Sequence, residues 1–252
     1  MTVAISSARP RVVCISQARM TSTRLPGKVL MTAAGKPLLA HHLERLRRCR
    51  QVDQVVLATT TNVGDDPVAA LATELGVGVS RGGEHDVLDR FARAANQFKA
   101  DLVVRVTADC PLIDPALIDA VIELYLSADP AAGYAAIDNS HIRGIEAEVF
   151  SVAALTEAAV YASSSAEREH VTPYLYRNPD RFRIVHLDPF APAAPPSDRH
   201  RWCVDEAPDF ELIRRLLEAL PPDFSFRDCL ALFEVHPEWL AINQGMVQKT
   251  VI

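Results

Sequence analysis

Short apolar runs alternate with amphipathic segments along the first half of the chain. Apolar runs bounded by turn residues predict buried strands, and apolar residues at three- and four-residue spacing predict helices. The predicted strands span 11–16, 55–59, 77–80 and 102–107, and the predicted helices begin beside Pro37, Asp66, Asp86 and Asp114. This α/β order favours a mostly parallel sheet with helices on both faces, in which ligands bind at the carboxyl ends of the strands.

The second half of the chain has a less regular pattern. Predicted strands span 134–138, 147–150, 182–188 and 201–204, and predicted helices span 151–161, 169–176 and 208–220. A Pro- and Ala-rich stretch at 191–197 predicts a loop. Because the sequence contains no internal repeat, we expect residues 1–252 to form a single domain.

The composition, with 49% hydrophobic and 23% charged residues, is that of a folded globular protein. The formal net charge of -6 argues against nucleic acid as a partner, because phosphate contacts require clustered Lys and Arg. The five cysteines form no Cys-x-x-Cys pair, so free thiols in a reducing compartment are expected. The N-terminus has no signal-peptide core, and no apolar stretch reaches about 18 residues, so a cytoplasmic protein without membrane contact is expected.

A polar loop at 17–28 follows the first predicted strand and combines cationic with hydroxyl side chains. These side chains belong to Arg19, Thr21, Ser22, Thr23, Arg24 and Lys28. Hydroxyl and backbone N–H groups can donate to a triphosphate, and Arg and Lys can neutralise its charge. The spacing differs from that of a Walker A loop. A solvated basic loop is the alternative interpretation.

Two aspartates from distant parts of the chain each follow a predicted strand. Asp109 comes after 102–107, and Asp205 comes after 201–204 and before a helix opened by Pro208. Mg²⁺ is commonly held by one or two carboxylates together with substrate phosphates, so the two aspartates form a candidate metal site. The alternative is that each aspartate only caps the turn or helix that follows it.

Together these segments resemble the cytidylyltransferase family of CMP-Kdo synthetase and CMP-sialic acid synthetase, and within it the spore coat polysaccharide biosynthesis protein F (SpsF) branch. The similarity lies in 18–28 (ARMTSTRLPGK), 35–38 (GKPL), 83–90 (GEHDVLDR), 107–112 (TADCPL), 146–150 (EAEVF), 168–174 (REHVTPY) and 204–205 (VD). It therefore extends over nearly the whole chain. The Kdo enzymes have Glu where this chain has Cys110, and the second-half segments follow the SpsF type, so the acceptor is left open.

The resemblance implies a GT-A-like nucleotidyltransferase fold with a smaller insertion in the second half, at 135–200, for acceptor binding and dimerisation. It implies transfer of CMP from CTP to a sugar or sugar-like acceptor, with release of pyrophosphate, in the biosynthesis of a surface polysaccharide or glycan. Mg²⁺ is the expected cofactor, and a homodimer is the expected assembly.

The resemblance also implies roles for individual residues. The metal would be held by Asp109 and Asp205, and these aspartates together with Arg19 and Lys28 would be the catalytic residues. The expected nucleotide contacts are Ala18, Arg19, Met20, Ser22, Arg24, Lys28, Thr59, Gly83, Asp86, Arg90, Thr107 and Asp109.

Polar residues of the second half are candidates for the acceptor pocket. They are His141, Arg143, Glu146, Glu148, Glu169 and His170. Glu146 and Glu148 lie two residues apart, so both can point to one face of a strand, although a solvated face is equally compatible. His170 is a candidate general base because histidine titrates near neutral pH, with a surface histidine as the alternative.

Other functions remain compatible with this pattern. A glycosyltransferase using a nucleotide-sugar would usually place its metal with an Asp-x-Asp motif, whereas Asp109 is followed by Cys110 and Pro111. A non-catalytic nucleotide-binding protein would lack the loop cations or a metal aspartate, and both are present. Another nucleoside triphosphate could replace CTP, because base choice depends on backbone contacts. The segment 236–252, with Asn243 and Gln244, is expected to pack back on the domain without an assigned function.

Overall fold

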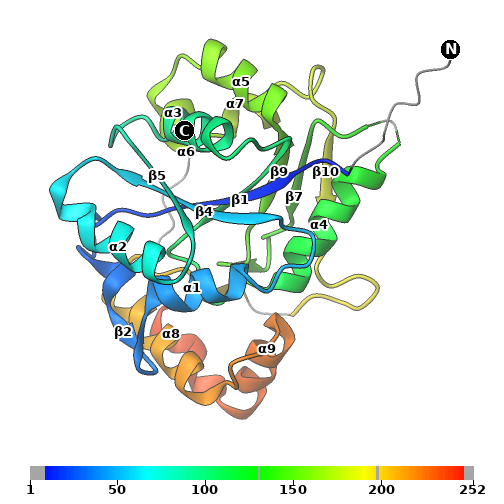
Figure 1. Cartoon of the computed structure of the whole chain (residues 1–252). Helices are drawn as coiled ribbons and strands as arrows, with labels where there is room; N and C mark the ends of the chain where they lie inside the picture. Colours follow the sequence, from blue (N-terminus) through cyan, green and yellow to red (C-terminus); the bar gives the residue numbers. More distant parts are fainter. Residues whose placement is uncertain (1–8, 130, 197–198, 247–252) are drawn as a thin grey trace, which may run out of the picture.

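The computed structural model describes residues 9–129, 131–196 and 199–246. Its described residues form a seven-stranded central sheet in the order β10-β7-β9-β6-β1-β4-β5 (Figure 1). The strands are β1 Val12–Gln17, β4 Gln54–Thr60, β5 Gly78–Gly82, β6 Leu102–Thr107, β7 Tyr134–Ile137, β9 Glu148–Ser151 and β10 Ile184–Leu187. β1 pairs in parallel with β4 and β6, whereas β9 is antiparallel to β6 and β7. The predicted mostly parallel sheet is confirmed.

Side chains alternate along β1 between two apolar layers. Val12 and Cys14 belong to one core cluster, whereas Val13 and Ile15 belong to the other. The first cluster packs against α1 Leu38–Leu46, α2 Asp66–Glu74, α4 Pro115–Ser127, α8 Ala207–Ala219 and α9 Phe226–Val235. The second packs against α3 Val87–Gln97, α5 Val152–Tyr161 and α7 Pro173–Tyr176. Helices therefore cover both faces of the sheet, as the continuous apolar run of a strand buried on both faces requires (Figure 1).

Helix starts in the first half follow the predicted capping residues. The Asp86 side chain accepts a hydrogen bond from the Asp89 N–H at the start of α3, and Asp114 accepts one from the Ala116 N–H at the start of α4. An N-cap carboxylate satisfies a backbone donor that the helix itself leaves unpaired. These caps place both helices directly after loops that border the carboxyl edge of the sheet.

The second half differs from the predicted elements at several places, among them α9, a helix that was not predicted. The single helix predicted over 169–176 is wrong, because the structure has two helices there. α6 Ser165–His170 is followed by Val171, whose φ is 72°, and α7 starts at Pro173. The strand predicted at 201–204 shortens to β11 His200–Arg201, which pairs with β8 Ile142–Arg143. The chain then runs as a loop into α8, and that loop presents Asp205.

Short elements complete the described chain. They are η1 Lys28–Leu30, β2 Thr32–Ala33, β3 Lys36–Pro37, η2 Val63–Asp65 and η3 Pro237–Ile242. All five cysteines are free and buried, as expected from their spacing. Within the described ranges, no helix is both long and apolar enough to cross a membrane.

Candidate active site

A cleft of about 1060 Å³ opens at the carboxyl ends of β1 and β6. Its walls come from the loop after β1, from β7 and β9, from α6 and α7, and from the loop before α8. The residues predicted as site residues that line it are Ala18, Arg19, Ser22, Arg24, Lys28, Arg90, Thr107, Asp109, Arg143, Glu146, Glu148, Glu169, His170 and Asp205. The nucleotide and acceptor candidates thus border one continuous cavity.

The loop after β1 folds back on itself. The Gly27 N–H donates to the Met20 carbonyl at 3.0 Å, and the Met20 N–H donates to the Asp65 carboxylate at 2.6 Å. Gly27 has a φ of 71°, and an added Cβ would lie 3.3 Å from the end of the Met20 side chain. Met20 therefore packs beneath the turn and does not line the cleft. Arg24 and Lys28 of the same loop lie at the floor of the cleft.

Lys28 lies where the two candidate metal aspartates converge. Its Nζ is 3.0 Å from Asp109 Oδ2 and 2.9 Å from Asp205 Oδ1, and it also donates to the Val204 carbonyl at 2.6 Å. Burial alone would lower the pKa of Lys28, but the two carboxylates outweigh it and raise the pKa. Burial alone would likewise raise the pKa of each aspartate, and Lys28 reverses that effect, so both pKa values are lowered. Both carboxylates are therefore ionised at neutral pH.

This donor set suits a divalent cation that also binds substrate. Asp109 and Asp205 each direct one oxygen to the same cationic atom, so a single ion can be reached by both. Among the described residues no group of three His, Cys, Asp or Glu side chains could enclose a metal alone. Mg²⁺ needs no such cage, because it usually combines one or two carboxylates with phosphate and water oxygens. The residues present therefore fit Mg²⁺ brought together with a nucleotide.

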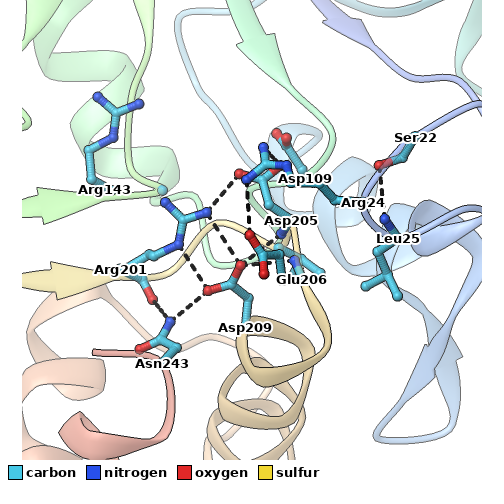
Figure 2. A network of polar contacts seen from close by, with 12 residues as sticks. Ser22, Arg24, Leu25, Asp109, Arg143, Arg201, Asp205, Glu206, Asp209 and Asn243 are labelled. Carbon is cyan, nitrogen blue, oxygen red and sulfur yellow. Dashed lines mark hydrogen bonds and ion pairs between the residues drawn. The ribbon is translucent and has the colours of Figure 1, made fainter. Parts of the chain in front are cut away.

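Asp205 has a second set of cationic partners. Arg24 Nη2 lies 3.0 Å from Asp205 Oδ1, and Arg201 Nη2 lies 2.7 Å from Asp205 Oδ2 (Figure 2). Arg24 comes from the loop after β1 and Arg201 from β11, so distant segments meet at one carboxylate. Arg201 was not predicted as a site residue. Its only local signal in the sequence is its position four residues before Asp205.

Arg19 and Arg90 are two of the expected nucleotide contacts that line the cleft. Arg19 Nη1 lies 3.4 Å from Glu84, and Arg90 Nη1 donates to the carbonyls of Gly83 and Glu84 at 2.6 and 2.8 Å. Gly83 therefore anchors Arg90 through its backbone and does not itself line the cleft. Arg90 is almost fully buried, at 3% exposure, so the position of its guanidinium is fixed by these bonds.

Thr59 and Asp86 also lie outside the cleft lining. Thr59 is fully buried on β4, and its hydroxyl has no hydrogen-bond partner among the described residues. Asp86 caps α3 and pairs with Arg168 of α6. The expected roles of Thr59, Gly83 and Asp86 beside the base and ribose therefore gain no direct support from the geometry.

Glu148 lines the part of the cleft where the acceptor candidates lie. It accepts hydrogen bonds from the Tyr134 and Thr172 hydroxyls and forms an ion pair with Arg105. Burial would lower the pKa of Arg105, but the charge of Glu148 outweighs it and raises that pKa. Arg105 and Tyr134 were missed, although a lone Arg inside the apolar strand 102–107 is a signal that could have found Arg105.

The other acceptor candidates divide between the cleft and its surroundings. Glu146 accepts from the Gly144 N–H and pairs with Arg143 at 3.0 Å. His170 lines the cleft from α6, and burial lowers its pKa. His141 does not line the cleft, since its ring packs edge-on against Phe190 with centroids 6.0 Å apart.

A buried histidine supports the loop that contains Asp109. His42 Nδ1 lies 2.9 Å from the Cys110 carbonyl, and His42 Nε2 lies 2.9 Å from Ser16 Oγ. Burial lowers the pKa of His42 to about 4, so the ring is neutral at physiological pH. Because a carbonyl can only accept, Nδ1 must donate and Nε2 must accept from the Ser16 hydroxyl. His42 thus links β1 to the turn after β6.

The chain is similar to known proteins over most of its length. The family profile described as cytidylyltransferase matches residues 13–229. An uncharacterized protein of Methanocaldococcus jannaschii is 35% identical over 95% of this chain and 97% of its own length. The spore coat polysaccharide biosynthesis protein SpsF of Bacillus subtilis is 32% identical over 90% of this chain and 95% of its own.

Of two further similarities, one covers nearly the whole chain and the other less than half of it. A solved cytidylyltransferase from Leptospira borgpetersenii has a TM-score of 0.85 and 29% identity, covering 96% of this chain and 100% of its own. The 3-deoxy-manno-octulosonate cytidylyltransferase of Geobacter sulfurreducens is 41% identical over 113 residues, which is 44% of each chain. The expected resemblance and the nucleotidyltransferase fold are both confirmed.

Proposed function

Because the chain belongs to the cytidylyltransferase family, we propose that it transfers CMP from CTP to a sugar-like acceptor and releases pyrophosphate. The observation that supports this most directly is the convergence of Asp109 and Asp205 on Lys28 at the floor of the cleft. Arg19 and Arg24, two cations of the loop after β1, border the same cavity. This combination suits a triphosphate that arrives with a divalent cation.

In the proposed reaction, an acceptor oxygen attacks the α-phosphorus of CTP and the bond to pyrophosphate breaks. Arg19, Arg24 and Lys28 neutralise the triphosphate and the departing pyrophosphate. Asp109 and Asp205 would hold Mg²⁺, whose charge polarises the α-phosphate. The protein therefore contributes mainly by positioning the two substrates and by stabilising charge.

We place the acceptor in the half of the cleft around Glu148. Glu146, Glu148 and Glu169 offer hydroxyl-binding carboxylates there, and His170 lies beside them. Because burial lowers the pKa of His170, its ring is neutral at physiological pH and can accept the proton of the attacking hydroxyl. The relative SpsF is named for polysaccharide biosynthesis, and we extend that role, for a surface polysaccharide or glycan, to this chain.

We further propose a cytoplasmic homodimer. All five cysteines are free, which suits a reducing compartment, the compartment that also supplies CTP. Val160 and Tyr161 at the end of α5 are 69% and 63% exposed, in the segment expected to form the dimer contact. Light scattering should give twice the chain mass of 27.6 kDa, and a monomer at micromolar concentration would contradict the assembly.

Pyrophosphate release provides the test of the reaction. The protein is incubated with CTP, Mg²⁺ and a panel of keto-acid sugars, sugar phosphates and phosphonates. We expect release with one acceptor class, and a loss of about 10²-fold or more in Asp205→Asn, as for other electrostatic stabilisers. Asp223→Asn makes the same chemical change at an exposed position outside the cleft and should leave the rate unchanged. A full rate in Asp205→Asn would contradict the assignment.

A further inference from the structure

The segment after α9 returns to the active-site side of the molecule. η3 packs against α8 and α9, and the chain then reaches Asn243, which is only 5% exposed. Asn243 Nδ2 donates to the Arg201 carbonyl and to Asp209 Oδ1, both at 2.9 Å (Figure 2). One amide group thus joins the C-terminal segment to β11 and to the first turn of α8.

Asp209 shapes the loop that holds Asp205. It is fully buried, and its Oδ2 accepts from the backbone N–H groups of Asp205 and Glu206, each at 3.0 Å. Its Oδ1 accepts from Arg201 Nε at 2.9 Å as well as from Asn243. Both oxygens of this buried carboxylate are therefore engaged, and they fix the backbone of the loop before α8.

Arg201 links the buried Asp209 carboxylate to the Asp205 side chain. Its Nη2 lies 2.7 Å from Asp205 Oδ2, and both side chains are about nine-tenths buried, at 10% and 11% exposure. Asp205 Oδ1, by contrast, faces Lys28 and Arg24 on the cleft side. Asp205 Oδ2 therefore contacts Arg201, whereas Oδ1 faces the cleft.

We propose that Asn243, Asp209 and Arg201 are positioning residues that orient Asp205, so that Oδ1 alone is presented to the cation of the substrate complex. This rests on the proposed role of Asp205 as a metal ligand. Asn243 is suited to the position because its amide donates to a carbonyl and a carboxylate without adding charge beside the Arg201–Asp209 pair. The C-terminal segment is therefore part of the catalytic unit, a role that the sequence alone did not assign.

The test compares three variants of the full-length protein. Asn243→Ala removes the donor, Asn243→Asp keeps the shape but puts a second carboxylate against Asp209, and Gln244→Ala alters the exposed neighbour as the control. Binding of Mn²⁺ to the protein–CTP complex is followed by electron paramagnetic resonance. The Mg²⁺ concentration for half-maximal turnover and the KM for the acceptor are measured in parallel.

We expect Asn243→Ala to weaken cation binding by about tenfold, in the range found for residues that orient metal ligands, and Asn243→Asp to weaken it further. The acceptor KM should stay within about twofold, because Asn243 contacts Arg201 and Asp209, whereas Glu148 is held by Arg105, Tyr134 and Thr172. Gln244→Ala should match the wild type in every measurement.

Several results would overturn the proposal. Wild-type Mn²⁺ and Mg²⁺ dependence in a folded Asn243→Ala would show that Asp205 needs no such support. A fall in thermal stability alone, or failure of Asn243→Ala to fold, would assign Asn243 a structural role only. Absence of CTP turnover and of Mn²⁺ binding in the wild type would instead refute the proposed function, so the two failures are distinguishable.

Discussion

Lys28 shows how a single side chain can join two distant parts of the chain. It contacts Asp109, which follows β6, and Asp205, which precedes α8, and all three residues were predicted as site residues. Their identities were readable because Lys28 ends the polar loop after the first predicted strand and each aspartate follows a predicted strand. Their meeting at one atom was not readable, because it depends on the path of the chain between them.

The residues that the sequence did not reveal act through such long-range contacts. His42 looks like one more position of an amphipathic helix, and only the structure places it between Ser16 and the Cys110 carbonyl. Arg105 is visible as a charge in an apolar strand, but its partner Glu148 comes from a strand 43 residues away. Residue type and local spacing do not encode these pairings.

His42 gives a prediction for stability against pH. Its pKa is about 4 in the folded protein against an ordinary value of 6.5, so the unfolded chain binds a proton first as the pH falls. The neutral buried ring therefore makes its full contribution to stability above about pH 6.5, and this contribution is lost as the pH falls towards 4. The free energy of unfolding should decrease by about 3 kcal/mol over this range. Denaturant unfolding of wild type and His42→Gln from pH 7 to 4 measures the difference between their slopes.

The control for this experiment is His85→Gln, since His85 is exposed. Its unfolding curve against pH should run parallel to that of the wild type. If His42→Gln also runs parallel to the wild type, His42 is not a neutral buried group and the support of the Asp109 turn is assigned wrongly.

At the level of elements, α3 and α4 begin where the capping residues predicted. Asp86 and Asp114 are caps that local sequence makes visible, because the bonds they form lie within three residues. The break between α6 and α7 was missed, since Val171 adopts a φ of 72° in a segment whose apolar spacing continues across it. That backbone geometry is imposed by packing, as Val171 is buried in the second core cluster.

The attachment of α6 predicts a separate effect on the acceptor. Arg168 joins α6 to Asp86 of α3 and to the Ala159 carbonyl of α5, next to Glu169 and His170 in the cleft. Arg168→Ala should raise the acceptor KM by roughly three- to tenfold, which corresponds to about 1 kcal/mol, the net contribution of a typical hydrogen bond. The Mg²⁺ requirement should not change, because Asp109 and Asp205 are held by other elements.

Steady-state kinetics with the acceptor and Mg²⁺ varied in turn measures both effects. Arg177→Ala, at the exposed end of α7, provides the matched loss of one arginine. An unchanged acceptor KM in Arg168→Ala would show that the position of α6 does not govern the acceptor half, whereas a changed Mg²⁺ requirement would show that the two halves of the cleft are not independent.

For the whole molecule, the two apolar layers follow from the continuous apolar runs of the strands, whose side chains point in turn to the two faces, so the sheet with helices on both faces was predictable. The return of the C-terminal segment was expected, but its contacts were not predictable, because helical periodicity shows that a face is apolar without showing what covers it. That return places the Asn243 amide against Arg201 and Asp209, which in turn contact Asp205 (Figure 2). A nucleotide bound in the cleft should stabilise the whole fold, because segments from both halves of the chain line this cleft.

Thermal unfolding with CTP, GTP, UTP or ATP, each with and without Mg²⁺, tests the central claim most directly. A ligand that binds only the folded state at 100 times its Kd adds about 2.7 kcal/mol to stability. The account predicts the largest shift with CTP, a larger shift when Mg²⁺ is present, and loss of that Mg²⁺ effect in Asp109→Asn. No shift with any triphosphate, together with a shift from a nucleotide-sugar, would contradict it.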